Sequence, residues 1–157
     1  MRMPMLSQQE ISDRLEIQDL FARYSFAIDD RNWDGLDDVF TEDAIIDYSE
    51  VGGSRGTYRE IKAWLGTAME RFKGFQHMVA TTEYKIDGDS ATTRTILFNP
   101  MIMYPDGSEV PGNDKVFFVG LWYRDKLVRT AKGWRIAERY EQKSWFHNSP
   151  AELAPPA

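Results

Sequence analysis

Helical periodicity fills the first half of the chain and strand-like runs fill the second half, and this division limits the fold more than any other feature. Apolar side chains recur at helical spacing in residues 7–29 and 57–72. The strand-like runs are 76–86, 90–104, 116–130 and 133–146. Because the helices come before the strands and do not alternate with them, the sequence predicts an α+β domain and not a βαβ fold.

Capping and turn signals support these boundaries. Ser7 with Glu10, and Thr57 with Glu60, form the capping-box pattern that begins a helix. Residues 87–89, Asp-Gly-Asp, are a tight-hairpin signal between the first two long runs. We therefore predict that the four long strands form one curved antiparallel sheet, which wraps around the N-terminal helices and leaves a conical cavity.

Size and composition fit a single domain over 1–157. The chain is 42% hydrophobic and 28% charged, and we place the domain core at about 7–147 and a tail, loose unless it docks, at 148–157. A net charge of −6 argues against nucleic acid as the main partner. No apolar run approaches the ~20 residues that span a bilayer, and the N-terminus lacks a signal-peptide pattern, so a cytoplasmic protein with no membrane partner is expected.

Residue content and missing motifs exclude several classes of site. The chain has no Cys, which excludes thiol nucleophiles and thiolate metal sites, and its two His would need carboxylates to complete a metal site. The glycine-rich nucleotide motifs, the zinc-protease motif and the hydrolase nucleophile motif are absent from the sequence. The sequence therefore predicts neither a metal nor an organic cofactor.

Aromatic residues are unusually frequent, at 13% of the chain. This content favours a pocket or an interface lined by rings, although a ring-rich core would explain it equally well. The run 116–123, VFFVGLWY, has more apolar side chains than one buried sheet face needs, so a homo-oligomer is expected. The candidate pocket residues are Phe21, Phe98, Asn99, Trp122 and Tyr140.

Two residues are candidates for proton transfer. His77 lies at the start of a predicted strand, and an imidazole exchanges a proton near neutral pH. Asp29 lies at the end of the first predicted helix, where its carboxylate could fix the tautomer of an imidazole. Spacing alone does not select Asp29 over Asp30, and the bland alternative is a structural histidine and a polar helix end.

Three further residues are candidates for stabilising charge: Arg139, Tyr24 and Tyr48. A buried arginine can stabilise a developing anion, and a tyrosine can donate a proton in a polar centre. Strict alternation puts Arg135 and Arg139 on one face of the last strand, which is more typical of a solvated face. Only a β-bulge would change that parity.

Three segments of the chain carry a family resemblance: YSFAIDDRNWDGLDDVFTEDAIIDYS, FQHM and GWRIAERYEQ. Together they resemble the SnoaL-like branch of the nuclear transport factor 2 superfamily, and within it the cofactor-free lyases. Those are scytalone dehydratase, bile-acid dehydratase and hexachlorocyclohexane dehydrochlorinase. The resemblance covers most of residues 7–147, and implies a conical α+β barrel with the pocket inside and a trimer, or else a dimer.

The resemblance also implies roles for individual residues. It makes His77 and Asp29 the catalytic dyad, selecting Asp29 over Asp30, and it makes Arg139 a pocket arginine. Tyr24 matches a pocket tyrosine, and Tyr48 a tyrosine on the first strand. One departure is that the second pocket histidine of scytalone dehydratase is missing here, and Asn99 falls in that region.

These observations predict a lyase that eliminates a group from a hydrophobic aromatic or polycyclic small molecule. His77 would take the proton, Asp29 would orient His77, and Arg139 with Tyr24 or Tyr48 would stabilise the departing group. Water, halide or a small carbonyl fragment such as formaldehyde are the possible leaving groups. Two alternatives remain open: an isomerase or cyclase resembling ketosteroid isomerase or polyketide cyclases, and a non-catalytic assembly module such as the small subunit of ring-hydroxylating dioxygenases.

Overall fold

The computed structural model describes residues 5–104 and 115–153. The turn-rich stretch predicted between the second and third long strands lies almost entirely outside these residues, as does the end of the predicted tail. The elements in chain order are α1 (Gln8–Asp29), η1 (Trp33–Asp38), β1 (Phe40–Asp47), η2 (Ser49–Val51), β2 (Arg55–Thr57), α2 (Tyr58–Ala68), η3 (Met69–Arg71), β3 (Phe72–Phe75), β4 (Met78–Asp87), β5 (Ser90–Met103), β6 (Val116–Thr130), β7 (Gly133–His147) and η4 (Ala151–Leu153).

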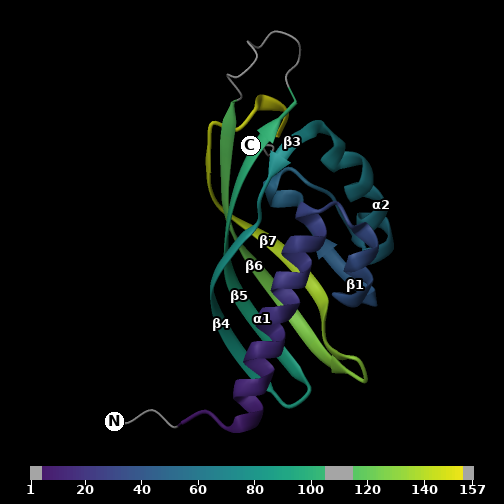
Figure 1. Ribbon diagram of the computed structural model, residues 1–157, viewed down its shortest axis with the longest axis vertical. Helices are drawn as coiled ribbons and strands as arrows, with labels where there is room; N and C mark the ends of the chain where they lie inside the picture. Colours follow the sequence, from purple (N-terminus) through teal and green to yellow (C-terminus); the bar gives the residue numbers. More distant parts are fainter. Residues whose placement is uncertain (1–4, 105–114, 154–157) are drawn as a thin grey trace.

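The strands form one curved sheet that covers α1 (Figure 1). The four long strands β4 to β7 pair antiparallel in sequence order, which confirms the predicted meander. In the described part of the chain, the complete sheet has seven strands and is mixed, because β1 lies parallel to β7. Its order is β2-β1-β7-β6-β5-β3, with β4 also paired to β5, and it does not close. Among the described residues, no helix combines the length and apolarity needed to cross a membrane.

Both predicted capping boxes are present, at the starts of α1 and α2.

Helix α1 ends in a strained turn that fixes the position of its last residues. In this turn, Arg31 has a left-handed φ of 55°, which costs a residue with a side chain about 1–2 kcal/mol. Its guanidinium donates hydrogen bonds of 2.7 Å to the carbonyls of Met69 and Phe72, and these contacts hold the turn against η3 and β3.

Strand β7 contains a β-bulge that decides which of its side chains face α1. Lys126 pairs with Glu138 but Leu127 pairs with Ile136, so Ala137 is one extra residue on β7. Before the bulge Ile136 faces the core, and after it Arg139 does. Strict alternation along the strand would have placed Arg139 on the outer face. The bulge is therefore present, and it turns Arg139 inward.

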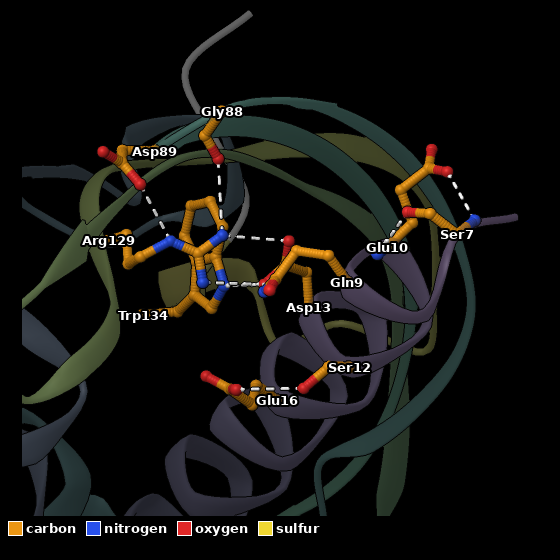
Figure 2. Close-up of polar contacts among 10 residues, drawn as sticks. All are labelled: Ser7, Gln9, Glu10, Ser12, Asp13, Glu16, Gly88, Asp89, Arg129 and Trp134. Atoms are coloured by element: carbon orange, nitrogen blue, oxygen red, sulfur yellow. Dashed lines mark hydrogen bonds and ion pairs between the residues drawn. The ribbon is translucent and has the colours of Figure 1, made fainter.

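The N-terminal part of α1 is joined to the sheet by the buried carboxylate of Asp13 (Figure 2). Arg129 on β6 donates to both Asp13 oxygens at 2.8 and 2.9 Å, and the indole of Trp134 donates at 3.1 Å. The Arg129 guanidinium lies over the Trp134 ring and also pairs with Asp89 of the β4–β5 hairpin. These hydrogen bonds, that of Arg129 foremost, lower the pKa of Asp13 below its usual value.

An Asp13→Asn variant is expected to lose about 2 kcal/mol of unfolding free energy at pH 7, because the Arg129 guanidinium loses its charged acceptor. A carboxylate whose pKa is lower in the folded than in the unfolded protein stabilises the fold at pH values above the unfolded-state pKa. This contribution is lost as the pH falls through the folded-state pKa. The gap between wild type and variant should therefore close below about pH 4. Urea unfolding followed by Trp fluorescence measures both effects.

The matched control is Asp19→Asn, on the same helix, whose side chain is 73% exposed and pairs only with the neighbouring Arg23. That change should cost less than about 0.5 kcal/mol. Equal losses in the two variants would contradict the stated role of Asp13.

Candidate active site

A hydrogen-bonded pair of His77 and Asp29 lies at one end of the sheet, where the end of α1 meets the start of β4. Nδ1 of His77 is 2.7 Å from Oδ1 of Asp29. The backbone N–H of His77 also donates to both carboxylate oxygens, at 3.1 Å each. The Asp29 side chain is 18% exposed and that of His77 only 8%, so both are largely shielded from water.

The geometry sets the tautomer of the imidazole. An ionised carboxylate only accepts hydrogen bonds, so the Nδ1 of His77 carries the proton that points at Asp29. The other ring nitrogen, Nε2, is then an acceptor, and Nδ2 of Asn99 donates a long hydrogen bond of 3.4 Å to it. The pair thus has the arrangement of a general base with an orienting carboxylate.

The His77 side chain and Asn99 line a cavity of about 100 Å³ between α1, α2 and the sheet. This volume is comparable to that of cavities that hold one ring-sized molecule. Most of the wall is apolar, and the remaining lining residues are Tyr24, Ile28, Tyr48, Val51, Gly52, Gly53, Trp64, Leu65, Ala68, Met69, Arg71, Phe72, Met101, Phe117, Val119, Leu121, Glu141, Phe146, Ser149 and Leu153.

Tyr24 and Tyr48 contribute a pair of hydroxyl groups to the same cavity. Their oxygens are 2.8 Å apart, and both side chains are buried. Burial raises the pKa of Tyr24 to about 12 and raises that of Tyr48 as well. Both hydroxyls therefore keep their protons at neutral pH; one donates to the other, and the remaining O–H can donate a hydrogen bond into the cavity. The edge of the Tyr24 ring also meets the His77 ring, with the centroids 6.4 Å apart.

Arg139 faces inward but lies behind the cavity wall, and this corrects its expected place in the pocket. Its guanidinium forms a two-pronged ion pair with Asp125, with both N–O distances at 2.8 Å, and neither side chain is exposed. The rings of Tyr24 and Tyr123 lie at 4.1 and 3.8 Å from the guanidinium carbon. Arg139 thus does not line the cavity itself, and it lies against the ring of Tyr24, which does.

Three of the predicted pocket residues face the wrong side of the sheet, because each neighbours an inward residue in a strand of period two. Asn99 lines the cavity, so Phe98 points outward and stacks on Phe118. Trp122 likewise points outward, beneath the guanidinium of Arg94. Tyr140 lines a polar groove on the outer face.

The fourth misplaced residue is Phe21, which is buried but lies beyond the cavity, with its ring 5.7 Å from the guanidinium carbon of Arg139. Of the five predicted pocket residues, only Asn99 therefore lines the cavity. The outer rings form an aromatic cluster in which Phe98 and Phe118 are half-buried and Trp145 is exposed. The predicted homo-oligomer stays a prediction.

Sequence reasoning missed most of the apolar wall of the cavity, and it also missed a buried acid and the docked start of the tail. Glu141 is 7% exposed and lines the cavity two residues after Arg139. Its position has a sequence signal, because residues two apart on a strand share a face once one of them is placed inward. Ser149 and Leu153 also line the cavity, so the start of the predicted tail docks on the site.

Across residues 5–104 and 115–153, no group of three or more His, Cys, Asp or Glu side chains is arranged to hold a metal ion. The expectation that the protein needs no cofactor stays a prediction.

Comparison with known protein families shows that residues 9–140 match the family described as a SnoaL-like domain. Uncharacterized proteins of Mycobacterium bovis and Mycobacterium tuberculosis are each 50% identical to this chain over 139 residues. Those matches cover 88% of this chain and 90% of each relative.

Solved structures share the same architecture. A Kribbella flavida protein is 28% identical, with a TM-score of 0.79 over 92% of this chain and 97% of its own. A candidate scytalone dehydratase of Novosphingobium aromaticivorans is 18% identical, with a TM-score of 0.79 over 96% and 97%. A LinA-type3 hexachlorocyclohexane dehydrochlorinase of Novosphingobium barchaimii is 17% identical, with a TM-score of 0.71 over 87% and 90%. At the last two identities the likeness is one of fold.

Proposed function

The chain belongs to the SnoaL-like domain family, and on that premise we propose that it is a cofactor-independent lyase acting on a hydrophobic, ring-containing small molecule. One observation carries the proposal. The imidazole of His77 is held by the Asp29 carboxylate at 2.7 Å, while its other side lines a mostly apolar cavity. The partner of the Nε2 nitrogen is Nδ2 of Asn99 at 3.4 Å, a long hydrogen bond that a substrate can replace.

In the proposed reaction, Nε2 of His77 takes a proton from a carbon next to a carbonyl group. Asp29 keeps the ring in the required tautomer and stabilises the imidazolium that forms. The Tyr24–Tyr48 pair donates its remaining O–H to the carbonyl oxygen as negative charge develops on it. The electron pair of the broken C–H bond then forms a double bond and expels a group from the next carbon.

The size of the cavity narrows the substrate class. A volume of about 100 Å³ suits one ring, and because the cavity is only half enclosed, a larger skeleton would extend out of its mouth. The substrates chosen to test the proposal therefore contain a single ring. Water, halide and formaldehyde remain the leaving groups that the proposed chemistry accommodates.

An isomerase is the second candidate, and the Tyr24–Tyr48 pair is the observation that favours it. Two hydroxyls beside a base suffice to stabilise a dienolate without any leaving group. In that case His77 would move a proton from one carbon to another. The assembly-module alternative is weaker, because a filled cavity would be expected at its core.

Three small ketones distinguish these functions, because each gives cyclohex-2-enone by a different reaction. These reactions are loss of water, loss of hydrogen chloride and isomerisation. We expect the wild-type protein to form this enone from 3-hydroxycyclohexanone or 3-chlorocyclohexanone, as measured by ultraviolet absorbance above the spontaneous rate. Formation only from cyclohex-3-enone would identify an isomerase and contradict the lyase. No acceleration with any of the three would favour a binding module.

A further inference from the structure

The cavity contains a titratable group that the dyad does not use, the carboxyl of Glu141. Strand β7 brings it inward after the bulge at Ala137, directly opposite Tyr123 of β6. The side chain is 7% exposed and lines the same cavity as His77, Tyr24 and Tyr48. A carboxyl group in an apolar wall needs a reason, because burying it costs free energy unless it is paired or protonated.

The carboxyl of Glu141 is not paired. Among the described residues, no hydrogen-bond or ion-pair partner of its oxygens is present. The groups that face it come from four elements: Arg139 on its own strand, Asp125 and Tyr123 on β6, Asp47 on β1, Tyr24 on α1, and the nearby Tyr48.

These surroundings favour the neutral form of Glu141. Burial is the largest effect, Arg139 opposes it, and the carboxylates of Asp125 and Asp47 add to it. The outcome is a pKa raised to about 8. At neutral pH the carboxyl therefore carries a proton inside the cavity.

We propose that Glu141 is the general acid of this site and gives its proton to the oxygen of a leaving hydroxyl group. The inference rests on the proposed lyase function and names its substrate class, a cyclic β-hydroxy ketone that loses water. Hydroxide is a poor leaving group and needs protonation, whereas a halide leaves as the anion. An acid in the wall would be superfluous for halide elimination.

The step balances without any further reactant. Nε2 of His77 takes the proton from the carbon next to the carbonyl, and the C–H electron pair becomes the C=C bond. The C–O bond breaks as the oxygen takes the proton of Glu141, so water leaves. Glu141 ends as a carboxylate and His77 as an imidazolium, and proton exchange with solvent after product release restores both.

Glu141 suits this role better than the two tyrosines. An efficient acid has a pKa near the working pH, and burial raises the pKa of Tyr24 to about 12. Tyr24 and Tyr48 are also engaged with each other at 2.8 Å. They are suited to donate hydrogen bonds, and Glu141 to transfer a proton.

The first arm of the test needs no substrate. Carbon-13 labelling of glutamate carboxyls should give one resonance that is absent from E141Q and that titrates with a midpoint near pH 8. Glu138→Gln is the matched control, because that side chain lies on the same strand, is 54% exposed and faces outward to Lys126. A Glu141 carboxyl already ionised at pH 6 would overturn the proposal.

The second arm compares 3-hydroxycyclohexanone with 3-chlorocyclohexanone. In E141Q, the ratio of the dehydration rate to the dehydrochlorination rate should fall by about 100-fold or more, and the wild-type decline in dehydration above pH 8 should disappear. Glu138→Gln should keep the wild-type ratio. An unchanged ratio in E141Q overturns the acid role while leaving the lyase intact. If His77→Ala eliminates both ketones as fast as wild type, the proposed function itself fails.

Discussion

Replacement of His77 by alanine is expected to lower turnover about 10²–10⁴-fold while leaving the fold intact. The variant loses the only imidazole in the cavity wall, and the other wall groups named here, Tyr24, Tyr48 and Glu141, are protonated at neutral pH and cannot accept the substrate proton. Asp29→Asn should be similarly severe, because an amide neither stabilises the imidazolium nor fixes the Nδ1–H tautomer. Initial rates of enone formation and thermal melting of each variant provide the measurement.

The second histidine supplies the control. His147 is exposed near the end of β7, where its ring stacks on Phe118. His147→Ala should keep wild-type turnover. A folded His77→Ala protein with near-normal turnover would show that the histidine is structural and would remove the mechanism.

Breaking the buried ion pair between Arg139 and Asp125 is expected to have the largest effect on stability. Asp125→Leu leaves the Arg139 guanidinium fully buried and without its counter-charge, which should lower the free energy of unfolding by about 3–5 kcal/mol. Removing both charges, with Asp125→Leu and Arg139→Met together, should recover most of that loss, because no charge then remains buried. Urea unfolding of the single and double variants measures the coupling between the two residues.

An exposed pair on the same two strands calibrates this effect. Lys126 and Glu138 are 64% and 54% exposed, so Glu138→Gln should cost less than about 1 kcal/mol. A double variant no more stable than Asp125→Leu alone would contradict the account of the pair.

The sequence was sufficient for the elements whose signals are local. The capping boxes at Ser7 and Thr57 and the hairpin at residues 87–89 were predicted correctly, because each depends on a few adjacent side chains. The parallel pairing of β1 with β7 was not predicted, because it joins segments about 90 residues apart and no local pattern encodes it. The contact between His77 and Asp29 came from the family resemblance and not from spacing.

The side of the sheet on which a residue lies was the harder question. Phe98, Trp122 and Tyr140 were chosen for their rings, yet each alternates with an inward neighbour, and alternation decides orientation more strongly than residue type. Arg139 could not be oriented from the sequence at all, because the answer depended on an unseen bulge. Glu141 was missed for the same reason.

The extra residue at Ala137 also matters for how related chains are compared. Because Ala137 is the extra residue between the pairs Leu127–Ile136 and Lys126–Glu138, a strand that lacked it would keep both pairs and would still place Arg139 and Glu141 on the inside. A relative that lacks this one residue would therefore present the same side chains to its cavity, although its sequence is one position shorter along the strand. Equivalent residues in such relatives are therefore identified by structural superposition of the strand, and an ungapped alignment through this point would pair residues from opposite faces.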